Sequence, residues 1–416
     1  QTHRIAEYAE LGIRHAVSGI PGPAFLEIPM DVFMGSCEWE QAMVPPIRTN
    51  PPRISPDRTD VREALELLRH AQRPMLMAGT SVKWSMAGPS MNAFLDETHM
   101  PGYTNGMGRG TIPPNSPQFL NRSRREAMKK IDLIILAGSL LDFRLAFGKT
   151  IPADAKIIQL DMDATLIGQN RPASVGLVGN LACTFELLLE EMKNAGVKLD
   201  FSGWRDELRK IEVEEEKKVE AALNSNESPV DPQRMCRETR DWLATLGDSI
   251  VIGDGGDIVA TAAKILPVPR EGAWMDPGPL GTLGVGMPFA LAAQIAHPKK
   301  RVVIMYGDGS FGLNGFEYDT AVRFGLPIIG VMGNDAAWGQ MMRPQGAVYG
   351  WDRLAATELT YTRYDKVVEA LGGHGEYCER PEEIRPALDR AAASGKPALV
   401  NIKIRQDKEY KGGIYV

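Results

Sequence analysis

Short apolar runs alternate with longer amphipathic stretches in two parts of the chain. In residues 57–195, a stretch with helical spacing precedes three apolar runs bounded by turn residues; the stretch and the runs lie at 61–71, 74–78, 133–137 and 156–160. Continuous apolar runs of this length are typical of strands that are buried on both faces of a parallel sheet. The alternation therefore predicts an α/β domain with helices on both faces of the sheet.

A second alternating unit covers residues 233–416. Its predicted strands lie at 249–252, 302–305, 328–332 and 398–402. Between the second and third of these strands, residues 314–324 have helical spacing, so we expect a βαβ crossover with both strands parallel. The second unit is thus also predicted to be α/β.

The segments outside these two units are of other kinds. Residues 1–42 contain a predicted helix at 4–17 and a predicted strand at 24–28, which are too few elements to bury a core of their own. The Pro-rich residues 43–56 predict an extended linker. Residues 196–232 are rich in charged side chains and predict a solvated helix followed by a linker, without a chemical role.

The composition narrows the classes of partner and the compartment. The chain has 416 residues and a net charge of -6 without a basic cluster, so nucleic acid is not an expected partner. No apolar run approaches the roughly 20 residues that span a bilayer, which argues against a membrane partner. The 4 cysteines form no CxxC pair and the 6 histidines show no metal-ligand spacing, so we expect a cytoplasmic protein without structural zinc.

Acidic turns follow two successive predicted strands of the second unit. Asp308 stands in a Gly-Asp-Gly turn after one strand, and Asp335 follows the next. Because parallel strands end at the same edge of the sheet, where ligands bind, the two carboxylates should face one small volume. A divalent ion such as Mg²⁺ would relieve their repulsion, and Gly307 and Gly309 would let backbone amides approach phosphate oxygens. The sequence thus predicts a metal–diphosphate anchor, with two ordinary strand-end turns as the alternative.

This pattern resembles the thiamine-diphosphate (ThDP) signature, a Gly-Asp-Gly turn and a helix followed by Asn-Asn or Asn-Asp. The stretches "GDGGDIVATAA" at 253–263 and "DPGPLGTLGVGMPFALAAQIA" at 276–296 are similar to two loops of acetolactate synthase, benzaldehyde lyase and 2-hydroxyacyl-CoA lyase. The stretch "SGIPGPAFLEIPMDV" at 18–32 is similar to the end of their pyrimidine-binding domain. The resemblance implies a ThDP-binding fold in which residues 233–416 bind diphosphate and Mg²⁺. It also implies that residues 1–42 are the C-terminal remnant of a pyrimidine-binding domain that the chain otherwise lacks.

The resemblance also implies roles for individual residues. It implies that the side chains of Asp308 and Asp335 and the backbone carbonyl of Ala337 are ligands of the metal ion. Asp335 stands at a position that relatives more often fill with Asn. Leu283 matches a bulky apolar residue that wedges the two cofactor rings into a V; a leucine packed in the core is the alternative. The other implied cofactor contacts are Gly255, Gly256, Asp257, Gly281, Gly307, Gly309, Ser310 and Trp338. The Glu that activates the cofactor in these enzymes has no counterpart in this chain.

The implied reaction breaks or forms a carbon–carbon bond next to a carbonyl group. The motifs "GPLGTLGVG" and "NDAAWG" look closer to the lyases, so the preferred interpretation is a 2-hydroxyacyl-CoA lyase. Such an enzyme cleaves a 2-hydroxyacyl-CoA to formyl-CoA and an aldehyde, or runs the reverse condensation. Acetolactate synthase, with a 2-oxoacid substrate, is the alternative, and a non-catalytic regulatory or assembly subunit with the ThDP fold is a hypothesis of another class. In the relatives two subunits share each cofactor, which implies a homodimer or homotetramer.

The sequence leaves two regions open. In the relatives the central domain, here residues 57–195, holds ADP, part of CoA, FAD or nothing. Asp161 or Asp163, at the end of a predicted strand, could bind a ribose, with a solvated turn as the alternative. The polar C-terminal residues 405–416 are either disordered or a lid over the substrate.

Overall fold

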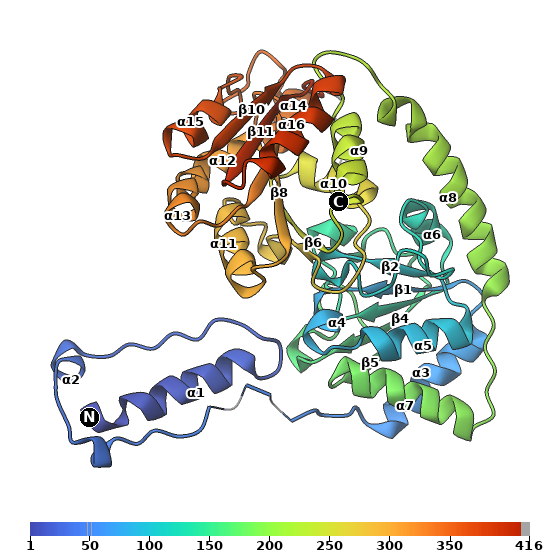
Figure 1. Cartoon of the computed structure of the whole chain (residues 1–416). Helices are drawn as coiled ribbons and strands as arrows, with labels where there is room; N and C mark the ends of the chain where they lie inside the picture. Colours follow the sequence, from blue (N-terminus) through green and yellow to red (C-terminus); the bar gives the residue numbers. More distant parts are fainter. Residues whose placement is uncertain (48, 51, 409–416) are drawn as a thin grey trace.

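Two parallel β-sheets, each covered by helices, form the body of the molecule (Figure 1). This is a computed structural model that describes residues 1–47, 49–50 and 52–408. It confirms the expected α/β class with helices on both faces. Residues 409–416, in the tail for which disorder and a lid were the alternatives, lie outside the described residues. No described helix combines the length and the apolar character needed to cross a membrane.

The central sheet has five strands in the order β2-β1-β3-β4-β5, all parallel. Because successive side chains of a strand point to opposite faces, they enter two separate cores. Leu76 and Ile135 pack with α3, α5 and α7, whereas Met75 and Ile134 pack with α6 and α8. The strands are β1 (Pro74–Ala78), β2 (Gly102–Thr104), β3 (Leu133–Ala137), β4 (Lys156–Asp161) and β5 (Val175–Val178). The helices are α3 (Arg58–His70), α4 (Thr80–Trp84), α5 (Gly88–Thr98), α6 (Arg124–Lys130) and α7 (Leu181–Asn194), with short 3-10 turns η3 (Gly106–Gly108), η4 (Phe143–Gly148) and η5 (Ala164–Leu166).

The C-terminal sheet has six strands in the order β10-β11-β9-β8-β6-β7, again all parallel. Val303 and Val331 pack with α9, α10 and α16 on one face, and Ile304 and Met332 pack with α11 and α13 on the other. The strands are β6 (Ser249–Asp254), β7 (Trp274–Met275), β8 (Arg301–Gly307), β9 (Ile329–Asn334), β10 (His374–Cys378) and β11 (Ala398–Lys403). The helices are α9 (Pro232–Leu243), α10 (Asp257–Ile265), α11 (Gly286–Ala296), α12 (Asp308–Asn314), α13 (Tyr318–Arg323), α14 (Gly339–Tyr349), α15 (Tyr364–Ala370) and α16 (Pro381–Ala393), with turns η6 (Gly278–Leu280) and η7 (Gly315–Glu317).

The crossover between β8 and β9 differs from the single helix that was expected at 314–324. The chain instead forms α12, the 3-10 turn η7 and α13 in succession. At the junction, a Cβ on Gly315 would lie 2.5 Å from Cε1 of Phe311. The ring of Phe311 thus packs against bare backbone, and the helix is interrupted at Asn314, whose φ of -135° is not helical.

The N-terminal segment lies apart from both sheets in Figure 1. Its helices are η1 (Thr2–Arg4), α1 (Ile5–Val17), α2 (Met30–Phe33) and η2 (Trp39–Gln41), and α1 agrees with the predicted helix. The strand predicted at 24–28 is wrong, because these residues are in neither sheet of the described chain and so lack a partner strand. Phe25, within that stretch, is 90% exposed.

The long charged helix α8 (Ser202–Leu223) runs along the side of the central domain toward the C-terminal domain (Figure 1). One of its faces is buried rather than solvated, since Trp204 and Leu208 belong to the core under β1 and β3. On the same face, the buried carboxylate of Glu212 accepts hydrogen bonds from the backbone of residues 121–123 at 3.2, 2.7 and 2.8 Å and from the Ser123 hydroxyl at 2.7 Å. Glu212 therefore attaches the helix to the loop before α6.

Replacement of Glu212 by alanine should detach this loop. We expect Glu212→Ala to lower the free energy of unfolding by about 2–3 kcal/mol, because several donors lose their acceptor in a buried position. Denaturant unfolding measures the change, and Glu216→Ala, at an exposed position of the same helix, is the matched control. Equal effects of the two substitutions would contradict the assigned role of Glu212.

Candidate cofactor site

Three turns meet at the carboxyl edge of the C-terminal sheet. β6, β8 and β9 are neighbours and run parallel. The turns that follow them hold Gly255 and Gly256, then Asp308, and then Asp335. The fold thus brings together the glycine turn and both acidic turns, at the edge where ligands of open parallel sheets bind.

Close backbone contacts shape these turns. Gly255 has a φ of 143°, and a Cβ there would lie 3.0 Å from the backbone nitrogen of Gly307. A Cβ on Gly309 would lie 2.7 Å from Cε3 of Trp338, so the indole packs directly on the Gly-Asp-Gly turn. Gly307 has more room, with Oγ of Ser310 nearest at 3.8 Å. Trp338 therefore closes the turn on one side and leaves Gly307 accessible.

The two carboxylates of the acidic turns are desolvated. Asp308 is 1% exposed, and its Oδ1 accepts a hydrogen bond from the amide of Gly309 at 2.9 Å. Its Oδ2 is buried without a hydrogen-bond partner among the described residues. Burial raises the pKa of Asp308, and burial together with the negative charges of Asp308 and Asp257 raises the pKa of Asp335. The charge of Asp308 thus makes the charged form of Asp335 less favourable, and a bound cation would reverse this.

The turn that carries Asp335 is held in an unusual backbone conformation. Ala336 has a φ of 56°, which a residue with a side chain rarely adopts. The side-chain oxygen of Asn334 accepts a hydrogen bond from the amide of Ala336 at 3.2 Å, and residues 357–359 pair with residues 336–338 on the other side. In turn, the Asn334 amide donates to Oδ1 of Asn401 on β11 at 3.2 Å. The sheet therefore imposes the shape of this turn.

A hard divalent cation fits this set of donors. Asp308 offers a buried oxygen without a partner, Asp335 a second carboxylate, and Ala337 a carbonyl that accepts no backbone hydrogen bond in the part of the chain described. Such oxygen donors are those that Mg²⁺ prefers, usually together with ligand phosphates and water. Within the described ranges, no group of three or more His, Cys, Asp and Glu side chains could hold a metal ion by itself. The fit therefore depends on a ligand that brings further oxygen atoms.

Asp254, the last residue of β6, was not among the residues expected at this site. Its buried carboxylate accepts hydrogen bonds from the amides of Gly284 at 3.0 Å and Gly286 at 2.7 Å. Asn314 donates to the carbonyl of Gly284 at 2.7 Å from the other side. Asp254 thus attaches the Gly-rich loop before α11 to the end of β6. The only sequence signal was its place in "GDGGD", directly before the expected diphosphate glycines.

Leu283 and Gly281 lie in this Gly-rich loop. Leu283 is half-buried and belongs to none of the core clusters of the described residues, so the alternative of a core leucine finds no support. Gly281 is exposed with a φ of 62°, and a Cβ there would meet no atom within 4 Å. The structure therefore places Leu283 beside the anchored Gly284, whereas the space beside the Cα of Gly281 is open.

The other expected cofactor residues lie around the glycine turn. Ser310 donates its hydroxyl hydrogen bond to the carbonyls of Asp254 at 2.7 Å and Gly307 at 2.9 Å, which links the ends of β6 and β8. A Cβ on Gly256 would lie 2.4 Å from Cδ of Gln340, so that side chain covers the glycine turn. Asp257, the first residue of α10, forms an ion pair with Arg343 of α14. The start of α14 thus closes over the turn after β6.

A pocket of about 210 Å³ lies at the carboxyl ends of β1 and β3 in the central domain, apart from the three turns of the C-terminal sheet. Both polar atoms of the Asn105 side chain and the hydroxyl of Ser139 are buried there without a partner among the described residues. Arg144, paired with Asp142 at 2.6 Å, brings a positive group. The wall is completed by Gly79, Thr80, Ser81, Trp84, Gly138, Leu140, Leu166, Ile20 of the N-terminal segment and Pro279 of the Gly-rich loop.

Asp161 and Asp163 lie at the end of β4 and differ from each other. Asp161 is 1% exposed, its Oδ2 has no partner among the described residues, and burial raises its pKa to about 6. The solvated turn that was the alternative reading does not describe Asp161. Asp163 accepts the amide hydrogen bond of Thr165 at 2.8 Å and thereby begins η5.

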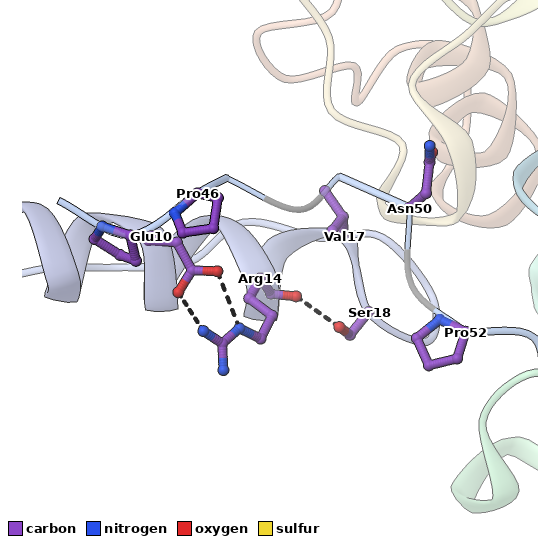
Figure 2. A pocket seen from close by; sticks show the side chains of 8 residues that line it. Glu10, Arg14, Val17, Ser18, Pro46, Asn50 and Pro52 are labelled. Carbon is purple, nitrogen blue, oxygen red and sulfur yellow. Dashed lines mark hydrogen bonds and ion pairs between the residues drawn. The ribbon is translucent and has the colours of Figure 1, made fainter.

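A groove of about 400 Å³ lies between α1 and the residues Pro45, Pro46, Asn50 and Pro52 (Figure 2). Glu10, which is buried, pairs with Arg14 along its wall, and Ser18 donates to the carbonyl of Arg14 at 2.6 Å. The rest of the wall is largely proline and valine. None of the residues that line this groove belongs to the three turns.

Comparison with known proteins agrees with this geometry. Two family models match, the central domain of thiamine pyrophosphate enzymes at residues 61–188 and their C-terminal TPP-binding domain at residues 254–402. The chain is 36% identical to a probable acetolactate synthase of Mycobacterium bovis, with 94% of this chain and 70% of the relative covered. It is 32% identical to 2-hydroxyacyl-CoA lyase 2 of Caenorhabditis elegans, with 97% and 69% covered, and 29% identical to oxalyl-CoA decarboxylase of Escherichia coli, with 94% and 70% covered. The chain therefore belongs to the thiamine pyrophosphate (thiamine diphosphate) enzyme family.

Proposed function

We propose that this protein is a ThDP- and Mg²⁺-dependent lyase or carboligase that acts on a carbon–carbon bond next to a carbonyl group. The observation that supports this most directly is the convergence of Asp308 and Asp335 at the carboxyl edge, with one buried carboxylate oxygen lacking a partner among the described residues. Such a pair is unfavourable without a cation, and it lies beside Gly307, which has room for phosphate oxygens.

The residues of the chain would divide the work of binding and orientation. When bound, ThDP supplies a thiazolium ring that accepts the electron pair released as the carbon–carbon bond breaks. Asp308, Asp335 and the carbonyl of Ala337 would hold Mg²⁺, and the amides around Gly255 and Gly256 would bind the diphosphate. Leu283, on the loop that Asp254 anchors, would hold the cofactor rings in position.

Within this class we propose a 2-hydroxyacyl-CoA lyase, with acetolactate synthase as the second candidate. The motifs "GPLGTLGVG" and "NDAAWG" favour the lyase, whereas the identity of 36% to the mycobacterial protein against 32% to the nematode lyase favours the synthase. The test incubates the full-length gene product, loaded with ThDP and Mg²⁺, with a 2-hydroxyacyl-CoA or with pyruvate. Release of an aldehyde and formyl-CoA supports the lyase, and formation of acetolactate supports the synthase. Activity with neither would favour the non-catalytic subunit.

For the central pocket we propose an adenine nucleotide as the occupant, either ADP or the nucleotide part of CoA or FAD. The support is the pair of unsatisfied polar side chains, Asn105 and Ser139, beside the guanidinium of Arg144. Asp161 at the neighbouring strand end would accept a ribose hydroxyl. Mass spectrometry of small molecules released from the purified protein would identify the nucleotide and distinguish ADP, CoA and FAD.

We also propose that the protein is a cytoplasmic homodimer or homotetramer. The support for self-association is four exposed apolar side chains, Leu280, Ile295, Leu313 and Phe316, which are 88%, 65%, 54% and 76% exposed. The last three lie on α11, α12 and η7, which contact one another, and we infer that the four side chains form one apolar face. The central helix of this face, α11, contains no charged residue, so two copies could meet there without repulsion between like charges. The four cysteines are free, as in a reducing compartment.

Loss of Asp308 should abolish the Mg²⁺-dependent part of ThDP binding. Asp308→Ala removes an anionic ligand of the ion, and we expect the affinity for ThDP to fall by about 100-fold or more. Asp335→Asn should be far milder, because an amide oxygen can still coordinate. Calorimetric titration with ThDP and Mg²⁺ measures both, with Asp319→Ala at an exposed position of α13 as the control. Unchanged affinity in Asp308→Ala would disprove the site.

Leu283 should matter more for turnover than for binding. If it wedges the cofactor rings, Leu283→Ala should leave ThDP affinity within about tenfold while turnover falls much further, because ring geometry supports the reaction rather than the anchoring. The control is Val213→Ala, at an exposed position of α8. Parallel losses of affinity and turnover would instead indicate a packing role.

The apolar face should control the oligomeric state. We expect Phe316→Asp to weaken self-association by about 100-fold, because two buried carboxylates would face each other across a two-fold contact. Light scattering over a range of protein concentrations measures the mass, and Val213→Asp on α8 is the control. A dimer that withstands Phe316→Asp would place the interface elsewhere.

A further inference from the structure

Helix α14 begins directly after the turn of Asp335 and connects it to the glycine turn. Gly339 and Arg343 are four residues apart on this helix and therefore share one face. From that face, the guanidinium of Arg343 donates a hydrogen bond to Oδ1 of Asp257, the residue that follows the glycine turn. Arg343 thus lies between the segment expected to bind the diphosphate and the segment expected to bind the metal ion.

Three charged groups converge at Gly339. A Cβ on this residue would lie 2.7 Å from Oδ2 of Asp257, 3.1 Å from Oδ2 of Asp335 and 3.4 Å from a terminal nitrogen of Arg343. Two carboxylates and one guanidinium therefore surround the same small volume. The absence of a side chain at Gly339 is what allows them to approach.

The surroundings of Arg343 favour the charged form of its guanidinium. Its side chain is 16% exposed, and that of Asp257 is 37% exposed. Burial lowers the pKa of Arg343, but the bond to Asp257 and the charges of Asp257, Asp407 and Asp335 outweigh this and raise it. Without the guanidinium, Asp257 would be a third negative group beside the pair Asp308 and Asp335.

We propose that Arg343 is a charge-compensating positioning residue that makes a carboxylate at position 335 compatible with an anionic diphosphate. The proposal rests on the proposed Mg²⁺–ThDP site. Arg343 acts through Asp257 and Asp335 rather than on the metal ion. An amide at position 335 would need less compensation, because it removes one negative charge from the turn.

The sign of the effect follows from electrostatics. Loss of the positive charge makes the turns more negative, which favours Mg²⁺ alone but repels the diphosphate. We therefore expect Arg343→Gln to lower ThDP affinity by about tenfold or more while Mg²⁺ affinity without ThDP stays the same or rises. Arg343→Lys keeps the charge and should retain most of the ThDP affinity.

A double-mutant cycle on the full-length protein tests the proposal. ThDP and Mg²⁺ affinities are measured by calorimetry for the natural protein, Arg343→Gln, Asp335→Asn and the double variant, with Arg353→Gln at an exposed position as the control. Compensation predicts that the double variant binds ThDP within about threefold of Asp335→Asn. Full additivity of the two losses, or weaker Mg²⁺ binding in Arg343→Gln, would overturn it.

The failure of this proposal is distinguishable from failure of the site. If Asp308→Ala binds ThDP normally, the site itself is wrong. If Asp308→Ala abolishes binding and the cycle is additive, the site stands and charge compensation by Arg343 is wrong. Denaturant unfolding of each cofactor-free variant shows whether lost affinity comes from damage to the fold. A cofactor-free Arg343→Gln protein that is already partly unfolded would also count against the proposal.

Discussion

The mutual repulsion of two desolvated carboxylates is the constraint around which the C-terminal domain is built. Asp308 and Asp335 reach one place because β8 and β9 are parallel neighbours joined by a crossover. The surrounding contacts then limit how far the pair can separate. Trp338 packs on the turn of Asp308, Asn334 fixes the turn of Asp335, and α14 closes beside both. A region that keeps such a pair buried is organised to receive positive charge.

Buried acceptors that bind backbone amides position the loops of this molecule. Asp254 attaches the Gly-rich loop, Asn334 fixes the turn of Asp335, and Glu212 attaches α8 to the central domain. Each of them satisfies backbone donors that a loop cannot pair by itself. Exposed ion pairs such as Arg323 with Asp319 are far more weakly stabilising, because water screens them. Local geometry at the site thus depends on a few desolvated hydrogen bonds.

Much of the architecture could be predicted from the sequence, since buried parallel strands are short apolar runs and acidic turns mark their ends. Strands β1 and β3 have the bounds that were expected, and the acidic turns lie together. Two local predictions failed for tertiary reasons. Residues 24–28 have no partner strand among the described residues, and the expected helix is interrupted at Asn314, whose side chain donates to the carbonyl of Gly284 in the Gly-rich loop. Asp254 and Arg343 escaped prediction because their partners are far away in sequence, and only the folded sheet brings them together.

The position of β11 has a consequence for the order of folding during synthesis. This strand is the last in sequence among the described residues, yet it lies between β10 and β9 in the interior of the sheet. Asn401 on β11 accepts the hydrogen bond of Asn334, whose side chain in turn holds Ala336 at its positive φ. A ribosome-bound chain that has produced β8 and β9 therefore contains both acidic residues but not the support that shapes their turn. The chain therefore becomes able to bind the cofactor only after β11 has left the ribosome and entered the sheet.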